Sequence, residues 1–324
     1  MPINIDGSKG IRQNTTEVTK IPVGTTAQRP ANPEAGMIRF NTDNGQVEGY
    51  NDPTDEWRPI NQFFQQVVAN GGTVTDISQD GQLFRVHTFT SDGTFEVTAG
   101  GGEVEYLIVA GGGGGGADSN GNSAGGAGAG GLLQGTTSVS NNAHTVLIGA
   151  GGNGSSGSDN FATNGQDSSV FGLSAVGGGF GATHRTSGDG ADGGSGGGAR
   201  RGAAPGLGIP GQGNDGAPGS AADAGASPSD TGGGGGGAET AASSPTGGNG
   251  KVINITGTEN AFAGGGAGLI SGSGTADGGT GGGGQSNTGG AGAAGLSNTG
   301  GGGGAGQTGG DGGSGIVIVR YRIG

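Results

Sequence analysis

The chain has 324 residues, of which 90 are glycine and none is cysteine, and its formal net charge is −13. The lack of cysteine excludes disulfides and thiolate metal sites, and the acidic balance argues against nucleic acid as a partner, because phosphate binding needs a basic face. Only 29% of the residues are hydrophobic, so a conventional apolar core cannot extend over the whole length.

The sequence begins Met1-Pro2-Ile3 without the charged and apolar regions of a signal peptide, so we expect no secretory leader. No apolar run approaches the roughly 18 residues that a membrane-spanning helix requires. We therefore expect a soluble protein that is assembled in the cytoplasm of the cell that makes it.

Residues 1–60 hold most of the ordinary β signals. Two short alternating runs, Met37–Phe40 and Val47–Tyr50, flank Asp43-Asn44-Gly45 and predict a β-hairpin. Trp57, the only tryptophan, follows and is expected to cap this small module. Residues 61–82 are expected to connect it to the rest of the chain. Within them, 61–70 fit a short amphipathic helix, a trimer contact or a plain linker.

From residue 83 to residue 324, strand-like runs alternate with glycine tracts such as Gly111–Gly116, Gly232–Gly237 and Gly281–Gly284. One strand-like run leads directly into the first tract, and the last tract leads directly into another. This order predicts a β frame whose opening and closing strands lie side by side. The predicted strands are Leu83–Thr90, Phe95–Thr98, Glu103–Ala110, His144–Ile148, Ser169–Val176, Lys251–Thr256 and Ile316–Ile323.

Glycine loses more backbone freedom on folding than any other residue, so such a composition is typical of disorder. The strands that bracket the tracts favour an ordered scaffold instead. Collagen is excluded, because six consecutive glycines have no Gly-X-Y register. A calcium-binding β-roll is also rejected, because Ser187–Asp192 is a single imperfect copy of its repeat.

A bundle of extended threefold helices of the polyproline II type, called polyglycine II when glycine forms it, satisfies the backbone through hydrogen bonds to neighbouring helices. The alternative is a purely β arrangement with long ordered loops. We favour the first. The predicted fold is mainly β, with little α-helix: a small N-terminal β module, then a β-sandwich-like frame enclosing polyglycine II-type helices. Valine at a mid-tract position such as Gly234 should then unfold or misassemble the domain.

The sequence matches to catalytic and nucleotide-binding motifs lack the surrounding residues that those motifs need to work. Gly149–Gly154 follows a strand and matches G-x-G-x-x-G, but the Ser-rich residues after it are a poor start for the helix that would face a pyrophosphate. The three histidines have no metal-ligand spacing, and no nucleophile elbow is present. We therefore expect a protein that is not an enzyme and that uses no cofactor or metal.

Bulky side chains inside the glycine-rich region are candidates for receptor binding, because exposed aromatic and arginine residues are common binding anchors. A separate group, Phe262, Leu269 and Ile270, is expected either on loops or packed against the β frame. The candidate receptor-binding residues are Phe180, His184 and Arg185 in one group, and Arg200, Arg201, Leu207 and Ile209 in another.

The N-terminal module resembles a short module of tailed-bacteriophage structural proteins, especially fibres of phages that infect marine bacteria and cyanobacteria. The resemblance rests on Gly24–Pro30, Gly36–Thr42, Gly49-Tyr50 and Trp57.

The remainder resembles glycine-rich phage fibre domains. The resemblance implies a virion protein, a homotrimer whose N-terminal module contacts other virion proteins and whose glycine-rich part is distal. It also implies that loops of the bundle recognise a bacterial surface receptor, an outer-membrane protein or a polysaccharide. The segments that carry it are Tyr106–Ala110, Val146–Gly152, Ser168–Gly172 and Gly315–Tyr321.

Three functions are consistent with these observations. The first is a tail fibre or fibre-tip adhesin that binds the host surface. The second is a capsid-vertex fibre, horn or decoration protein with a purely structural role. The third, an extracellular ice-binding or matrix protein, shares the glycine physics but not the phage-like N-terminal module.

Overall fold

The computed structural model describes residues 21–51, 56–60, 67–157, 160–183, 188–220, 230–272 and 274–323. The chain forms two compact units, Met1–Gln65 and Gln66–Gly324. Both are built from β-strands and extended segments, so the mainly β prediction is confirmed.

The N-terminal unit is a four-stranded sheet in the order β1-β2-β3-β4, with β1 parallel to β2 and the other pairs antiparallel. Asn41 pairs with Gln46 across the predicted hairpin, and Gly45 has a φ of 69°, which suits glycine. Trp57 lies opposite Tyr50, with ring centroids 5.7 Å apart. The elements are β1 (Val23–Gly24), the 3-10 helix η1 (Thr26–Gln28), β2 (Ile38–Asn41), β3 (Gln46–Asn51) and β4 (Glu56–Pro59).

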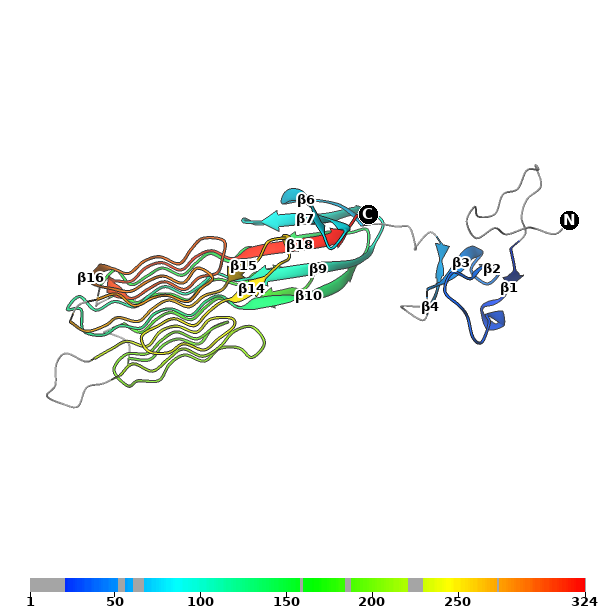
Figure 1. The fold of residues 1–324 in the computed structure, drawn as a ribbon. Helices are drawn as coiled ribbons and strands as arrows, with labels where there is room; N and C mark the ends of the chain where they lie inside the picture. The colour runs from blue at the N-terminus through cyan, green and yellow to red at the C-terminus, as the bar shows by residue number, and fades with distance from the viewer. Residues whose placement is uncertain are drawn as a thin grey trace. The chain divides into compact units, whose positions relative to one another are not determined.

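The second unit opens with a sandwich of a five-stranded sheet, ordered β10-β9-β18-β7-β6, and a three-stranded sheet, ordered β11-β8-β5. Strands β9 and β18 are antiparallel neighbours, which confirms that the opening and closing strands lie side by side (Figure 1). The strands are β5 (Val68–Asn70), β6 (Thr73–Gln79), β7 (Gln82–Phe89), β8 (Gly93–Ala99), β9 (Gly102–Val109), β10 (Leu132–Val139), β11 (Ala143–Val146) and β18 (Ile316–Arg322).

Three short pairs complete the strands described in this unit. β12 and β13, and β14 and β15, form antiparallel hairpins, whereas β16 and β17 pair in parallel. Their bounds are β12 (Ser168–Val170), β13 (Leu173–Ala175), β14 (Lys251–Ile253), β15 (Asn260–Phe262), β16 (Asn287–Ala291) and β17 (Gly306–Thr308).

The end of β9, Leu107–Val109, and the start of β18, Ile316–Val319, are buried on both faces, which explains why these stretches are continuous apolar runs rather than alternating ones. One face, including Ile108 and Val317, packs against Phe95 of the three-stranded sheet. The opposite face, including Leu107 and Ile318, packs in a second cluster that contains hairpin β14–β15.

Within the predicted connecting segment, residues 68–70 and 73–79 form strands β5 and β6. Strand β5 pairs with β8 and β6 pairs with β7, so the boundary between the units lies between Gln65 and Gln66. The helix considered for 61–70 is wrong at its end, because Val68–Asn70 form strand β5. Residues 61–66 lie outside the described residues. The predicted strand Ser169–Val176 is instead a hairpin that reverses at Phe171 and Gly172, both with positive φ.

The glycine tract Gly111–Gly116 satisfies its backbone entirely through other segments. Its N–H groups donate in rotation to three neighbours at 2.8–3.0 Å, its carbonyls accept in rotation from three others, and residues three apart share a neighbour. No residue of the tract has a positive φ. The neighbours that accept are residues 163–166, 310–313 and 125–128, which run antiparallel to the tract; those that donate are 178–181, 152–155 and 303–306, which run parallel to it.

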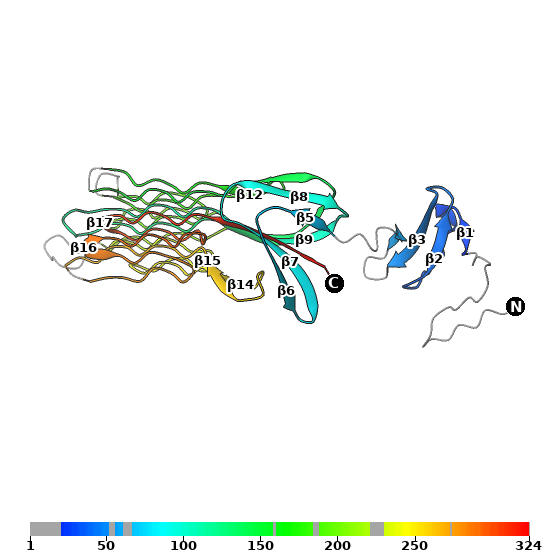
Figure 2. The ribbon, with the colours of Figure 1, turned by 90° about the horizontal axis from the view of Figure 1, so that it is seen from above.

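This threefold rotation with six neighbours is the hydrogen-bonding pattern of polyglycine II, so the structure supports the extended-helix prediction over long β loops. One detail of that prediction is wrong. The bundle is not enclosed by the sandwich but extends from one end of it (Figures 1 and 2). The reason is continuity of direction: β9 leads straight into Gly111, and Gly315 leads straight into β18.

Outer segments lack neighbours on one side, and acidic or amide side chains replace the missing carbonyl acceptors. Asn164 and Asp167, three residues apart on one face of their segment, accept from the N–H groups of Phe180 and Gly177, each at 2.9 Å. Asp189 and Asp192 repeat this with the N–H groups of Ala204 and Leu207. The Asp pair that imitates a calcium repeat is therefore engaged in capping backbone groups.

Candidate functional site

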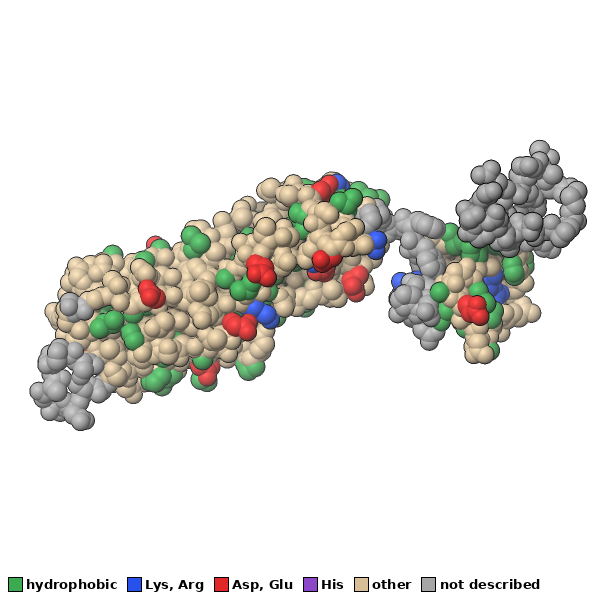
Figure 3. All heavy atoms as spheres, viewed as in Figure 1, with side chains coloured by type: hydrophobic (Ala, Val, Ile, Leu, Met, Phe, Trp, Pro, Cys, Tyr) green, Lys and Arg blue, Asp and Glu red, His purple; other side chains and the backbone are tan. Residues whose placement is uncertain are grey.

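The extended segments reverse direction at both ends of the bundle, and the end away from the sandwich carries β16 and β17 (Figures 1 and 2). We call this end the distal tip and define it by residues 118–123, 200–202, 270–272, 274–275 and 287–291. Along the flank between tip and sandwich, backbone, glycine and uncharged polar atoms cover most of the face drawn in Figure 3.

A buried ion pair fixes the first loop of the tip. The Arg200 guanidinium donates to Asp118 Oδ2 at 2.8 Å and to the Ser123 carbonyl at 2.7 Å, and Asp118 is fully buried. The Asp118 carboxylate also accepts from the Asn120 N–H at 3.0 Å. Each charge is paired and hydrogen-bonded, as burial requires. The loop therefore has one arrangement held from beneath.

A second clamp joins the other two loops. Thr288, almost fully buried, directs its hydroxyl at the carbonyl oxygens of Ile270, at 2.7 Å, and of Gly274, at 3.0 Å. Between the clamped loops lies an open cavity of about 630 Å³, which we call the tip cavity. Its lining is residues 120–122, 271–272, 274–275, 287–289 and Gln307.

The described lining of the tip cavity is polar but uncharged. Its side chains are amides and hydroxyls, and several glycines expose backbone. The side chains of Asn120, Asn122 and Gln307 make no hydrogen bond within the described part of the chain. Amides on the flank differ: Asn164 and Gln212 each accept a backbone N–H from a neighbouring segment.

The structure does not bring the candidate receptor-binding residues together. Arg200 is 9% exposed and belongs to the clamp, so its side chain is not displayed. Arg201, beside it, is exposed and forms an ion pair with Asp230 at 2.9 Å. His184 and Arg185 lie outside the described residues.

The remaining candidates lie along the bundle rather than at its tip. Phe180 is half-buried in the segment that runs beside Gly114. Leu207 and Ile209 are exposed, at 59% and 36% respectively. The N–H of Leu132, at the start of β10, donates to the carbonyl of Gln212, so the turn after Ile209 lies at the sandwich end.

In the third group only Phe262 packs against the frame; Leu269 lies in a separate small cluster with Ala124 and Ala305, and Ile270 belongs to a loop of the distal tip. Phe262 and Leu269 are buried, and Phe262 lies in the apolar cluster on the outer face of the five-stranded sheet. The cavity residues were missed because small polar residues are common throughout this chain. The available signal was clustering: Ser119–Asn122 and Gln285–Thr288 concentrate amides and hydroxyls between glycine tracts.

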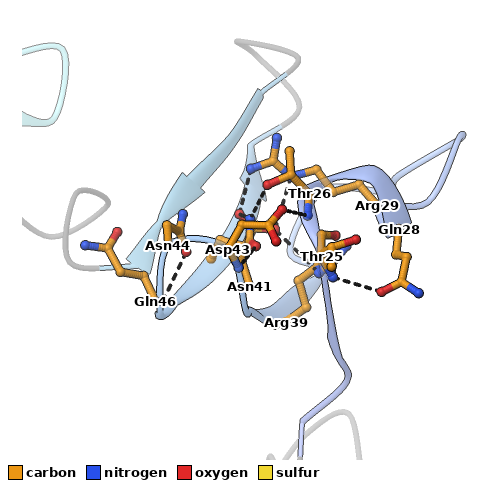
Figure 4. Close-up of polar contacts among 10 residues, drawn as sticks. Thr25, Thr26, Gln28, Arg29, Arg39, Asn41, Asp43, Asn44 and Gln46 are labelled. Atoms are coloured by element: carbon orange, nitrogen blue, oxygen red, sulfur yellow. Dashed lines mark hydrogen bonds and ion pairs between the residues drawn. The ribbon is translucent and has the colours of Figure 1, made fainter.

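The N-terminal unit has its own polar centre at Glu48, and Figure 4 labels Arg29, Arg39 and Asn41, which surround it. Its fully buried carboxylate accepts from Arg29 Nη2 at 2.7 Å and from Asn41 Nδ2 at 3.0 Å. The hydrogen bonds from Arg29 hold the pKa of Glu48 below its ordinary value, although burial acts in the opposite direction. The Arg39 guanidinium donates to the Thr25 carbonyl and lies 5.8 Å from the Trp57 ring centroid. This network fixes η1 and β1 against the hairpin.

Among the described residues, no three histidine, aspartate or glutamate side chains gather closely enough to hold a metal ion. The same residues form no helix with the length and hydrophobicity needed to cross a membrane. The G-x-G-x-x-G stretch is an extended segment of the bundle: Gly152, for example, donates to the Gly112 carbonyl.

A comparison with curated proteins gives no match. A family described as a glycine-rich domain matches residues 88–322, from inside β7 to the last residue of β18. The match contains the central strands of the sandwich, the bundle and the distal tip. The chain therefore belongs to this glycine-rich domain family.

Proposed function

We propose that the chain is a bacteriophage virion fibre protein and that its glycine bundle is a rigid scaffold presenting the distal tip to a bacterial surface. The observation that carries the proposal is the contrast between flank and tip. Backbone groups on the flank are consumed by neighbouring segments or by capping side chains, whereas the tip has clamped loops with unused polar groups. Binding sites are common on loops that a rigid scaffold positions.

The N-terminal module supports the virion part of the proposal through its resemblance to tailed-phage structural proteins. Its surface offers an open apolar cavity of about 360 Å³, lined in part by Val23, Ile38 and Trp57. Val23 and Ile38 are about half exposed. We assign this surface to contacts with other virion proteins, and we expect the chain to assemble as a homotrimer.

Exchanging tip loops tests the adhesin role. Replacing 118–123 together with 287–291 by glycine-serine turns should reduce adsorption of virions to their host. A matched control replaces the turn 209–212 at the sandwich end and should leave adsorption unchanged. Unchanged adsorption after the tip exchange, with the variant folded and incorporated, would reject the adhesin role.

The second candidate is a capsid-vertex fibre or decoration protein without a receptor. The absence of a gathered aromatic or arginine anchor among the described tip residues favours it. Electron microscopy of intact virions, labelled with antibody against residues 66–324, separates the two. Label at the far end of tail fibres supports the adhesin, and label at capsid vertices supports the alternative.

A further inference from the structure

We infer that the tip cavity is a binding site for a neutral saccharide. The inference rests on the proposed function, since it names the chemical class of receptor that the distal tip would recognise. Five side chains carry it: Asn120, Asn122, Ser271, Thr275 and Gln307, all facing the cavity of about 630 Å³.

The first argument is unused hydrogen-bonding capacity. None of these five side chains is hydrogen-bonded to another described residue. They come from three separate stretches of the chain that meet only at the tip. Each amide offers two donors and one acceptor oxygen, and each hydroxyl offers one donor and two acceptor lone pairs. A ligand that also carries both donors and acceptors at every position, as a sugar ring does, can use such a lining fully.

The second argument is the absence of charge in the lining. Among the residues that the structure describes, no lysine, arginine, aspartate or glutamate lines the cavity. Two charged pairs lie close to the lining, Asp118 with Arg200 beneath the first loop and Asp230 with Arg201 beside Ser271, and each pair is internally neutralised. An anionic ligand would find no cation there and would meet a chain whose formal net charge is −13. A cationic ligand would find no carboxylate. The chemistry therefore selects neutral over charged saccharides.

The third argument is preorganisation. The Asp118–Arg200 ion pair holds the loop that carries Asn120 and Asn122, and the Thr288 hydroxyl bridges the carbonyls on either side of the loop after Ile270. A ligand then meets groups that are already positioned, so little ordering entropy opposes binding. The volume lies within the range of about 300–1,000 Å³ that small-molecule sites occupy. Glycines in the lining let a ring approach the backbone closely.

Binding of neutral saccharides to the full chain tests the inference. The probes are the methyl glycosides of glucose, galactose, mannose and N-acetylglucosamine and their neutral disaccharides, with sialyllactose and a sulfated disaccharide as charged controls. Saturation-transfer NMR should show contact with at least one neutral probe and none with the charged ones. The double variant Asn120→Ala, Asn122→Ala should weaken that binding about tenfold, since two hydrogen bonds are lost.

Two further variants keep the test decisive. Gln307→Ala removes an amide from a different loop and should weaken binding by a smaller factor. Asn153→Ala removes an exposed amide on the flank and should have no effect. Failure of every neutral probe to bind, or binding that the cavity variants leave unchanged, would overturn the saccharide site. If the intact chain still adsorbs to cells in that case, the adhesin role stands; if adsorption is absent as well, both fail.

Discussion

The sandwich and the glycine bundle share one chain but bury their backbones in different ways. In the sandwich, side chains such as Phe95 and Val317 fill the space between sheets that hydrogen-bond within themselves. In the bundle, the place of a side chain is taken by a neighbouring carbonyl: a Cβ atom added at Gly114 would overlap the carbonyl oxygen of Asn153. The first region is therefore sensitive to loss of atoms, and the second to gain of a single one.

The largest effect is expected from Gly114→Ala. The added methyl has no free space, and every segment around it is held by others, so we expect destabilisation of more than about 4 kcal/mol, enough to unfold or misassemble the domain. The matched control is Gly289→Ala, where the nearest atom to the new Cβ is 3.8 Å away. Circular dichroism and limited proteolysis report the difference.

Gly234→Val extends this test to a second buried tract, where the new Cβ would overlap the Thr246 carbonyl oxygen. An effect within about 0.5 kcal/mol at this position or at Gly114 would show that the tracts behave as solvated loops.

The next effect is loss of packing in the sandwich. Phe95 is fully buried, so Phe95→Ala should cost about 3–5 kcal/mol through lost contacts and a residual cavity. Leu83→Ala on β7, where the side chain is 48% exposed, is the control and should cost far less. Denaturant unfolding of the full chain gives both values; equal costs would contradict the packing difference.

A smaller effect is expected at the edge of the bundle. Asp167→Ala leaves the buried N–H of Gly177 without its acceptor, which should cost about 1–3 kcal/mol. Asp167→Asn keeps an oxygen acceptor and should recover most of the loss. Hydrogen exchange at Gly177 is the direct readout, and slow exchange in the alanine variant would show that the cap is dispensable.

The smallest effect is pH dependence confined to the sandwich. His87 is buried, its Nδ1–H donates to the Gly71 carbonyl at 2.7 Å, and its Nε2 lies 3.2 Å from the Tyr321 hydroxyl. Burial lowers the pKa of His87 below its ordinary value of about 6.5. The neutral, buried His87 contributes fully to the free energy of unfolding above its ordinary pKa. As the pH falls toward the lowered pKa, this contribution declines, because the unfolded chain takes up the proton first.

We therefore expect the unfolding midpoint to fall modestly between pH 7.5 and 5.5, and His87→Gln to remove that part of the pH dependence. In the bundle, the Gly114 N–H donates to the Thr163 carbonyl, and neither group titrates. Its hydrogen-exchange protection, corrected for intrinsic rates, should therefore not change with pH. An identical pH profile for wild type and His87→Gln would exclude this role.

Much of the sandwich was predictable because strong apolar runs mark its central strands. β9 and β18 were placed as neighbours from their positions at the two ends of the glycine tracts. Strands β6 and β10 were missed because each is exposed along part of its length and carries many polar residues. β10 is held by its full pairing with β9, which the local sequence does not reveal.

The bundle was predictable in kind but not in arrangement. Glycine content and the lack of a collagen register indicate threefold extended helices, yet which segments become neighbours depends on long-range contacts between almost identical sequences. The same limitation affected the site. Arg200 has the type of side chain that anchors a partner, but burial beside Asp118 makes it structural. Asn122 has no sequence signal other than the polar residues next to it.

The threefold rotation of Gly111–Gly116 also constrains how such a chain can change in length. Removing one residue from a tract would turn every later residue by a third of a revolution and direct its N–H at the wrong neighbour. Removing three restores the direction and shortens the segment by about 9 Å. Insertions and deletions within the bundle should therefore be tolerated in multiples of three residues, with a matching change in the adjacent segment. The turns at the tip need not follow this rule of three.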